Sequence, residues 1–212
     1  MVDWLTSTAI HVLGYDISWA EVLGDVTGAF SVWWAARERV GTWPIGILNS
    51  ALFLVLFLDA KLYADSILQV AFIVLGVYGW WRWLAGSPTG VGELEVRRTA
   101  PREWLVLGLV TVAAQAAWTA WLAWHTDSPA PFWDAALLVL SLVATYGQAK
   151  KLVESWWIWI LVDVISVPLY LSRDLAPTAI LFAAFGLMCV VGLRDWTRAL
   201  HQVETPIAVG AP

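Results

Sequence analysis

The stretch SWWIWILVDVISVPLYLS, residues 155–172, determines the class of fold. It contains a single charged side chain, on Asp163, in an otherwise apolar run with a few hydroxyl groups. A helix needs ~20 residues of this kind to cross ~30 Å of bilayer hydrocarbon. Lipid offers no hydrogen-bond partner to an open strand edge, so a helix is the expected structure. Six further stretches have the same character: residues 19–36, 43–60, 62–84, 104–124, 132–149 and 176–196.

The composition of the whole chain agrees with seven membrane spans. Hydrophobic residues make up 60% of the 212 residues and charged residues only 14%, whereas soluble domains carry about 25% charged residues. The chain also contains 17 tryptophans, a residue that concentrates at membrane–water interfaces and in sites that stack aromatic ligands. Cys189 is the only cysteine, so no internal disulfide can form. We therefore expect an all-α, multi-pass membrane protein.

The basic residues predict how the chain is oriented. With seven alternating spans, ten of the twelve Lys and Arg residues fall on one side of the membrane and only Lys61 and Arg173 on the other. Loops rich in Lys and Arg stay in the cytoplasm. We therefore predict a protein of the inner (cytoplasmic) membrane with its N-terminus outside and its C-terminus in the cytoplasm. The ten residues are Arg37, Arg39, Arg82, Arg97, Arg98, Arg102, Lys150, Lys151, Arg194 and Arg198.

The two ends of the chain resemble each other at an offset of about 113–114 residues. Trp43, six residues before Asn49, matches Trp157, six residues before Asp163. Other matched pairs are Arg37 with Lys151, Leu58 with Leu171, Leu62 with Leu175, Gly79 with Gly192 and Trp83 with Trp196. Two parallel three-helix repeats joined by a lone linker helix would give this pattern, with a substrate near the midplane between them. The alternative is that any two apolar stretches of three spans look alike.

The repeat hypothesis divides the chain into six parts. They are an extracytoplasmic segment 1–18, repeat one 19–85, a cytoplasmic loop 86–103, the linker helix 104–124, repeat two 132–198 and a cytoplasmic tail 199–212. The tail contains Pro and Gly, and we expect residues 201–212 to be disordered.

Residue Asp163 is the sharpest candidate for a functional group. It lies about eight residues into its span, roughly 12 Å deep at 1.5 Å per residue, where ionisable groups are costly and usually functional. Trp156, Trp159, Ser166 and Tyr170 share its helical face at spacings of three and four. Indole rings around one anion suit a flat, positively charged ring. The alternative is a neutral, protonated Asp163 that bonds a neighbouring helix.

Three further polar residues lie in the first half of the chain. Asn49 is the expected repeat counterpart of Asp163, although a buried amide also serves as a hydrogen bond between helices. Gln69 lies deep enough to bond a sugar hydroxyl or a carboxamide. Asp65, four residues earlier on the same face, either faces the outer mouth of a cavity or is a solvated residue at the helix end.

Several other chemistries find no support in the sequence. The three histidines are scattered and one cysteine cannot build a thiolate site, so neither a metal nor a cofactor is expected. No nucleotide-binding or nucleophile-elbow motif is present. The loop 86–103 mixes acidic and basic residues, unlike a nucleic-acid surface. A retinal pigment would need a lysine inside its last helix, where this chain has none. We therefore do not expect an enzyme.

Several motifs resemble those of the PnuC family of transporters. They are Gly46-Ile47-Leu48-Asn49, the run Lys61 to Gln69, Gly79-Trp80-Trp81-Arg82-Trp83, Pro131-Phe132-Trp133-Asp134, and the runs Lys150 to Trp156 and Asp163 to Val167. The likeness covers residues 18–198 in order. It implies a fold similar to SWEET-type sugar carriers, with three helices, a linker helix and three more. It also implies uptake of nicotinamide riboside by facilitated diffusion, followed by trapping through a cytoplasmic kinase.

The same resemblance implies which residues contact substrate. They are Asn49, Gln69, Trp159 and Asp163. Many nicotinamide riboside members have Asn where this chain has Asp163, and an anion there suits the pyridinium of nicotinamide riboside or the thiazolium of thiamine. Two alternatives therefore stay open: a thiamine or other vitamin transporter of this family, and a non-transporting membrane scaffold. The sequence also leaves open whether the chain forms a homo-oligomer.

Overall fold

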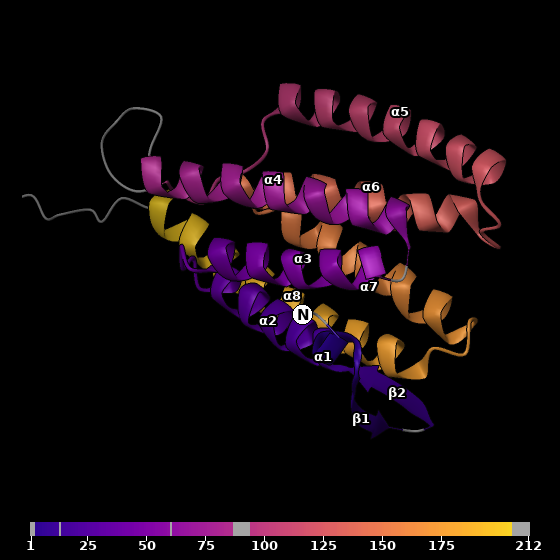
Figure 1. Cartoon of the computed structure of the whole chain (residues 1–212). Coiled ribbons are helices and arrows are strands. Elements are labelled where there is room, and N and C mark those ends of the chain that lie inside the picture. The colour runs from indigo at the N-terminus through magenta and orange to yellow at the C-terminus, as the bar shows by residue number, and fades with distance from the viewer. Residues whose placement is uncertain (1–2, 13, 60, 87–93, 205–212) are drawn as a thin grey trace, which may run out of the picture.

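The computed structural model describes residues 3–12, 14–59, 61–86 and 94–204, and nearly all of them belong to helices (Figure 1). The long helices are α2 (Trp19–Ala36), α3 (Thr42–Asp59), α4 (Tyr63–Ala85), α5 (Pro101–His125), α6 (Pro131–Ala149), α7 (Ser155–Leu171) and α8 (Ala176–Glu204). Before them come α1 (Asp3–Thr6), β1 (Thr8–Val12) and β2 (Tyr15–Ser18). Ala60 and residues 87–93 of the expected loop 86–103 lie outside the described residues.

The seven long helices lie at the seven expected spans. Five of them, α3, α4, α5, α6 and α8, are long and apolar enough to cross a membrane. Helix α7 is apolar but only 17 residues long. Helix α2, which carries Glu21 and Asp25 in its first half, is not among the five. The helical membrane fold is confirmed, whereas full crossing by α2 and α7 remains a prediction.

The N-terminal segment contains a β-hairpin that the hydropathy pattern did not predict. Strands β1 and β2 pair antiparallel, and Gly14 between them has a positive φ of 87°, which glycine adopts without steric cost. Helix α2 starts directly afterwards because Ser18 and Glu21 form a reciprocal capping box. Glu21 thus has a structural role at the helix start.

Helix α8 is longer than expected and continues to Glu204. Trp196 and Leu200 are buried against the bundle, so packing holds the helix beyond its apolar span. The prediction of disorder was therefore wrong for residues 201–204, while residues 205–212 lie outside the described part of the chain.

Six of the long helices pack as a closed ring. Their neighbours follow the order α2, α3, α4, α6, α7, α8 and back to α2. Helix α5 lies at the edge of the bundle against α6 (Figure 1), and its large apolar side chains are mostly exposed. We call the end of the ring that carries Arg37, Arg82, Lys150 and Arg194 the basic end.

Four tryptophans form two matching pairs near the basic end. Trp43 and Trp83 meet edge to face at 5.4 Å and 86°, and Trp156 and Trp196 meet at 5.5 Å and 88°. Trp83 and Trp196 in turn lie 6.1 Å apart. These rings belong to one buried apolar cluster between the two halves of the chain. Residues 113 apart thus make the same contact, an offset also spanned by the Glu38–Lys151 ion pair.

Hydrogen bonds to the backbone and unusual backbone angles also recur at an offset of 113 residues. Trp83 donates its indole N–H to the carbonyl oxygen of Gln148 at 3.1 Å, and Trp196 donates to that of Ala35 at 3.0 Å. Positive φ values recur at Glu38 with Lys151 and at Lys61 with Asp174. These matches support the predicted repeats, which remain a prediction as an overall arrangement.

The matched contacts correct the register of that prediction. Trp43 corresponds to Trp156 rather than to Trp157, which is 61% exposed. The same offset pairs Asp163 with Ser50, so Asn49 lies one residue away from the position we expected. The expected match of Arg37 with Lys151 shifts in the same way, because Lys151 corresponds to Glu38. The sequence contains two adjacent tryptophans here, which makes both registers look alike.

Candidate substrate-binding site

The predicted stripe of α7 faces the interior of the protein. Asp163 is 5% exposed, and Ser166 and Trp156 are both fully buried. Helix α8 comes close at Gly186, where an added Cβ would lie 3.3 Å from the Cβ of Asp163. The carboxylate therefore points neither to lipid nor to solvent. It faces α8 at a position where that helix has a glycine and no side chain.

Four polar atoms on this stripe are buried and have no hydrogen-bond partner among the described residues. They are the indole nitrogens of Trp156 and Trp159, Oδ2 of Asp163 and Oγ of Ser166. Buried polar groups in native proteins are nearly always bonded, and exceptions indicate an absent ligand, a water or strain. The stripe offers three donors and one acceptor in a row, which is the chemistry of a site for a polar aromatic solute.

Helix α8 lines the other side of the stripe with small residues that sequence reasoning missed. Gly186 and Cys189 lie beside Asp163, and Gly192 lies against the ring of Trp156. Their spacing of three residues in an apolar helix was the signal that could have identified this face. A side chain larger than a thiol here would push α8 away from α7.

An aromatic chain connects Tyr170 with the first half of the protein. Tyr170 stacks on Phe182 at 5.2 Å, and Phe182 meets Phe185 edge to face at 6.3 Å. An added Cβ on Gly28 would lie 3.5 Å from Phe185 and 3.4 Å from the amide nitrogen of Asn49. Phe182 and Phe185 thus bridge two predicted site residues that lie on different helices.

Asn49 is engaged between helices, as the alternative interpretation foresaw. Its amide nitrogen donates to the carbonyl oxygen of Gly24 at 2.5 Å and to Oγ1 of Thr27 at 3.3 Å. Both partners lie on α2. The amide therefore ties α3 to α2, and only the rest of its polar surface is available to a solute.

The remaining two candidates lie apart from Asp163 along α4. Gln69 is half-buried, and its side chain has no hydrogen bond among the described residues. Asp65 is exposed near the end of the ring opposite the basic end, within electrostatic range of Asp134 and Tyr170. The carboxylate of Asp134 forms an ion pair with the guanidinium of Arg173, with 2.7 Å between Oδ1 and the nearest nitrogen. Gln69 fits a site and Asp65 fits a solvated entrance.

Two cavities on the described surface lie away from this stripe. One lies between α7 and α8 at the basic end, and the other lies among α5, α6 and α7. Neither is lined by a residue of the predicted site. Neither of these two cavities reaches the stripe, where Trp159 and Tyr170 are half-buried.

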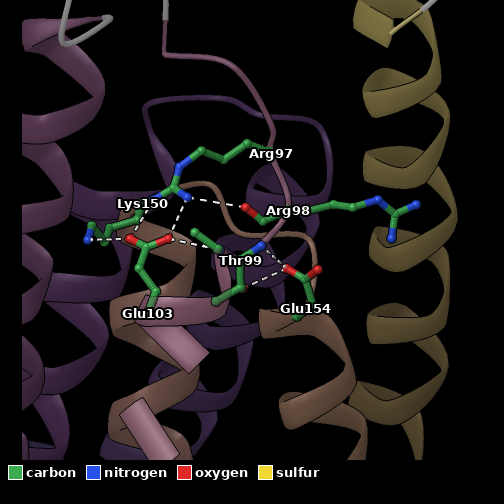
Figure 2. A network of polar contacts seen from close by, with 7 residues as sticks. Arg97, Arg98, Thr99, Glu103, Lys150 and Glu154 are labelled. Carbon is green, nitrogen blue, oxygen red and sulfur yellow. Dashed lines mark hydrogen bonds and ion pairs between the residues drawn. The ribbon is translucent and has the colours of Figure 1, made fainter. Parts of the chain in front are cut away.

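A segment that we call the strap, residues 94–100, crosses the basic end (Figure 2). Its backbone pairs with the turn between α6 and α7: the N–H of Arg97 donates to the carbonyl of Lys151, and that of Val153 donates to the carbonyl of Arg97. Thr99 donates its N–H and its hydroxyl to one oxygen of Glu154, at 2.9 and 2.8 Å. The strap is therefore fixed along its length.

Ion pairs and apolar packing hold the strap further. Arg97 donates two hydrogen bonds to the carboxylate of Glu103, which also accepts one from Lys150 at 2.9 Å. The pKa of Arg97 is raised, chiefly by its hydrogen bond to Glu103. Leu94 and Val96 are buried in the same cluster as the paired tryptophans. The strap is thus packed firmly across the turn between α6 and α7 at the basic end.

Beside the strap lies a buried ion pair. The ammonium of Lys151 lies 2.7 Å from a carboxylate oxygen of Glu38 and 4.7 Å from the centre of the Trp83 ring. The Lys151 side chain is only 6% exposed. The carboxylate of Glu38 and the ring of Trp83 thus take the place of the water molecules that normally surround a lysine ammonium group.

A ring of apolar helices with buried polar groups on α7 has the features expected of a membrane transporter for a small solute. The family model described as nicotinamide mononucleotide transporter matches residues 18–198, and the chain belongs to this family. The resemblance noted in the sequence is thereby confirmed. Family and relatives are transporters rather than enzymes, which supports the expected absence of enzymatic activity.

The chain is similar to two characterised relatives and to one solved structure. The nicotinamide riboside transporter PnuC of Escherichia coli is 28% identical, over 89% of each chain. The riboflavin/roseoflavin transporter RibM of Streptomyces davaonensis is also 28% identical, over 100% of each chain. The fold is similar to that in the crystal structure of the vitamin B3 transporter PnuC, with a TM-score of 0.69 at 20% identity, covering 87% of this chain and 83% of that one. These findings support a transporter of a vitamin or vitamin precursor.

Proposed function

We propose that this protein carries nicotinamide riboside inward across the cytoplasmic membrane by facilitated diffusion. The observation that supports it is the row of unpartnered buried groups on α7 around one carboxylate, Asp163. A carboxylate with an unused oxygen favours a cationic ring, and nicotinamide riboside carries its positive charge on a flat pyridinium. Phosphorylation by a cytoplasmic kinase would trap the solute.

In the proposed complex the ring stacks on Trp159 and its charge faces Asp163. The hydroxyl of Ser166 and the indole N–H of Trp156 would then bond the carboxamide or ribose, which would satisfy the atoms that are unpartnered now. Gln69 would reach the ribose from α4. Asn49 would contribute only its carbonyl oxygen, because its amide nitrogen is bonded to α2.

In the proposed transport step, the protein alternates between a conformation that is closed on one side of the membrane and a conformation that is closed on the other. The two three-helix repeats would rock against each other around the stripe, with α5 as the linker. With the N-terminus outside, the basic end faces the cytoplasm, so the strap and the Glu38–Lys151 pair close the exit in this conformation. Substrate release would require both contacts to loosen.

Riboflavin is the second candidate, because RibM matches the full chain at the same identity as PnuC. The two substrates differ in charge, since the riboflavin ring is neutral at neutral pH. Thiamine, a cation, stays an alternative on the same grounds as nicotinamide riboside. The charge on Asp163 therefore separates riboflavin from the two cations, and direct competition separates the cations.

The experiment is uptake of labelled nicotinamide riboside into proteoliposomes that contain the purified chain. Wild type should equilibrate the label, unlabelled nicotinamide riboside should compete better than riboflavin or thiamine, and Asp163→Ala should lower uptake by at least tenfold. Asp59→Ala is the matched control, because Asp59 is exposed at the end of α3, and it should leave uptake unchanged. Saturable uptake of riboflavin alone would transfer the proposal to that vitamin, and no uptake of any of the three would favour a scaffold.

A further inference from the structure

A cavity of about 450 Å³ opens between α7 and α8 at the basic end. Three arginines line it, Arg98 from the strap and Arg194 and Arg198 from α8, together with the apolar side chains of Trp157 and Leu193. In Figure 2 the Arg98 side chain extends away from the polar network toward α8. The cavity therefore combines positive charge with an apolar wall, and it is separate from the Asp163 stripe.

The acidic groups nearby only partly offset these charges. Glu154 lines the cavity, but one of its oxygens accepts both hydrogen bonds from Thr99. Asp195 lies 3.5 Å from Arg198, and the Arg198 side chain is still 69% exposed. Arg194 is exposed on α8. The two exposed arginines of α8, Arg194 and Arg198, thus offer the cavity positive charge that an anion would complement.

The surface beside the cavity is apolar on both helices. On α8, Leu187, Val191, Arg194 and Arg198 follow one another at spacings of four, three and four, so one exposed face changes from apolar to basic along its length. On α7, Trp157, Leu161 and Val164 form an exposed row that starts at the cavity. An acyl chain could lie along these rows while a headgroup occupies the cavity.

We propose that this cavity binds the phosphate headgroup of an anionic phospholipid, with its acyl chains along the exposed rows of α7 and α8. Basic pockets between spanning helices are suited to such headgroups, and an interfacial tryptophan such as Trp157 packs against the boundary between headgroup and chain. The repeat counterparts of Arg194 and Arg198 are Trp81 and Ala85, so only one half of the protein carries this site. The leaflet involved rests on the proposed orientation, but lipid binding does not.

The experiment is native mass spectrometry of the purified full chain with equal amounts of phosphatidylglycerol and phosphatidylcholine. Wild type should retain phosphatidylglycerol preferentially. The double variant Arg194→Gln with Arg198→Gln should lower its occupancy at least fivefold. The control is Arg39→Gln with Arg102→Gln, which removes two exposed charges at the same end and should leave occupancy unchanged.

The measurement also distinguishes lipid from soluble anions. An equal loss of phosphatidylglycerol in both double variants would overturn the proposal, because general charge would then explain retention. Inorganic phosphate that raises the unfolding temperature in detergent as much as phosphatidylglycerol does would also overturn it, in favour of a soluble ligand. If the α8 double variant does not fold, Arg198→Gln alone replaces it, with Arg39→Gln as its control. Failure of riboside uptake leaves this result unaffected.

Discussion

Glu38 and Lys151, which lie 113 residues apart, share a left-handed backbone conformation and form an ion pair with each other. Their φ values are 54° and 51°. If the two halves are related by a two-fold axis, residues that pair with their own counterparts must lie beside that axis. In that arrangement the pair would stand at the centre of the basic end, where the halves would have to part for release.

The first prediction concerns this ion pair. Glu38→Gln leaves a buried ammonium without its counter-charge, and the free energy of unfolding should fall by about 1–3 kcal/mol, because breaking a buried pair costs about 3–5 kcal/mol and Glu38 is 31% exposed. Thermal unfolding in detergent measures the change. The swap of Glu38→Lys with Lys151→Glu should recover at least half of it. A swap no more stable than Glu38→Gln would contradict a direct pairing.

The second prediction concerns the strap. Glu154→Gln weakens two charge-assisted hydrogen bonds from Thr99, and such bonds contribute about 1.5–3 kcal/mol each at most. Backbone amide exchange in residues 94–100 should become at least fivefold faster. Glu95→Gln is the control, since Glu95 is exposed on the same segment, and its exchange should match wild type. Equal protection in both variants would mean that Leu94 and Val96 hold the strap without Glu154.

The third prediction concerns close packing of the paired tryptophans. A Cβ on Gly192 would lie 2.6 Å from ring atoms of Trp156, so Gly192→Ala should destabilise the protein by about 1–3 kcal/mol, the usual cost of overpacking. Gly108→Ala is the matched control, because nothing lies within 4 Å of its added Cβ and alanine favours a helix by about 1 kcal/mol over glycine. Thermal unfolding should show a lower midpoint for the first variant and no loss for the second. Trp156→Leu together with Gly192→Ala should recover part of the loss, provided that the clash is its cause.

The sequence predicted those features that depend on local pattern. The seven long helices were placed correctly because hydropathy and helix ends are local properties, and the burial of the stripe around Asp163 followed from helical spacing alone. The burial of the strap residues Leu94 and Val96 could not be predicted from the sequence, because it depends on helices far away in the chain. The register of the repeat was wrong by one residue for a related reason. Trp156 and Trp157 are the same residue type, and only their packing against α8 distinguishes them.

The last prediction tests whether the unpartnered groups exist for a ligand. Ser166 is fully buried and its hydroxyl has no hydrogen-bond partner in the part of the chain that the structure describes, an arrangement that costs about 1–3 kcal/mol. Ser166→Ala should therefore raise the unfolding temperature of the ligand-free protein while it weakens stabilisation by nicotinamide riboside. Ser155 provides the contrast, because it is equally buried but donates to the carbonyl of Leu152 at 2.7 Å.

For Ser155→Ala we expect the opposite pattern, lower stability without ligand and an unchanged response to nicotinamide riboside. Ser155 is the first residue of α7 and Ser166 lies in its interior, so the response to nicotinamide riboside, and not the size of the stability change, distinguishes the two variants. If Ser166→Ala were stabilising and bound nicotinamide riboside as wild type does, the hydroxyl would be an uncompensated defect, and the α7 stripe would lose its strongest claim to be the binding surface.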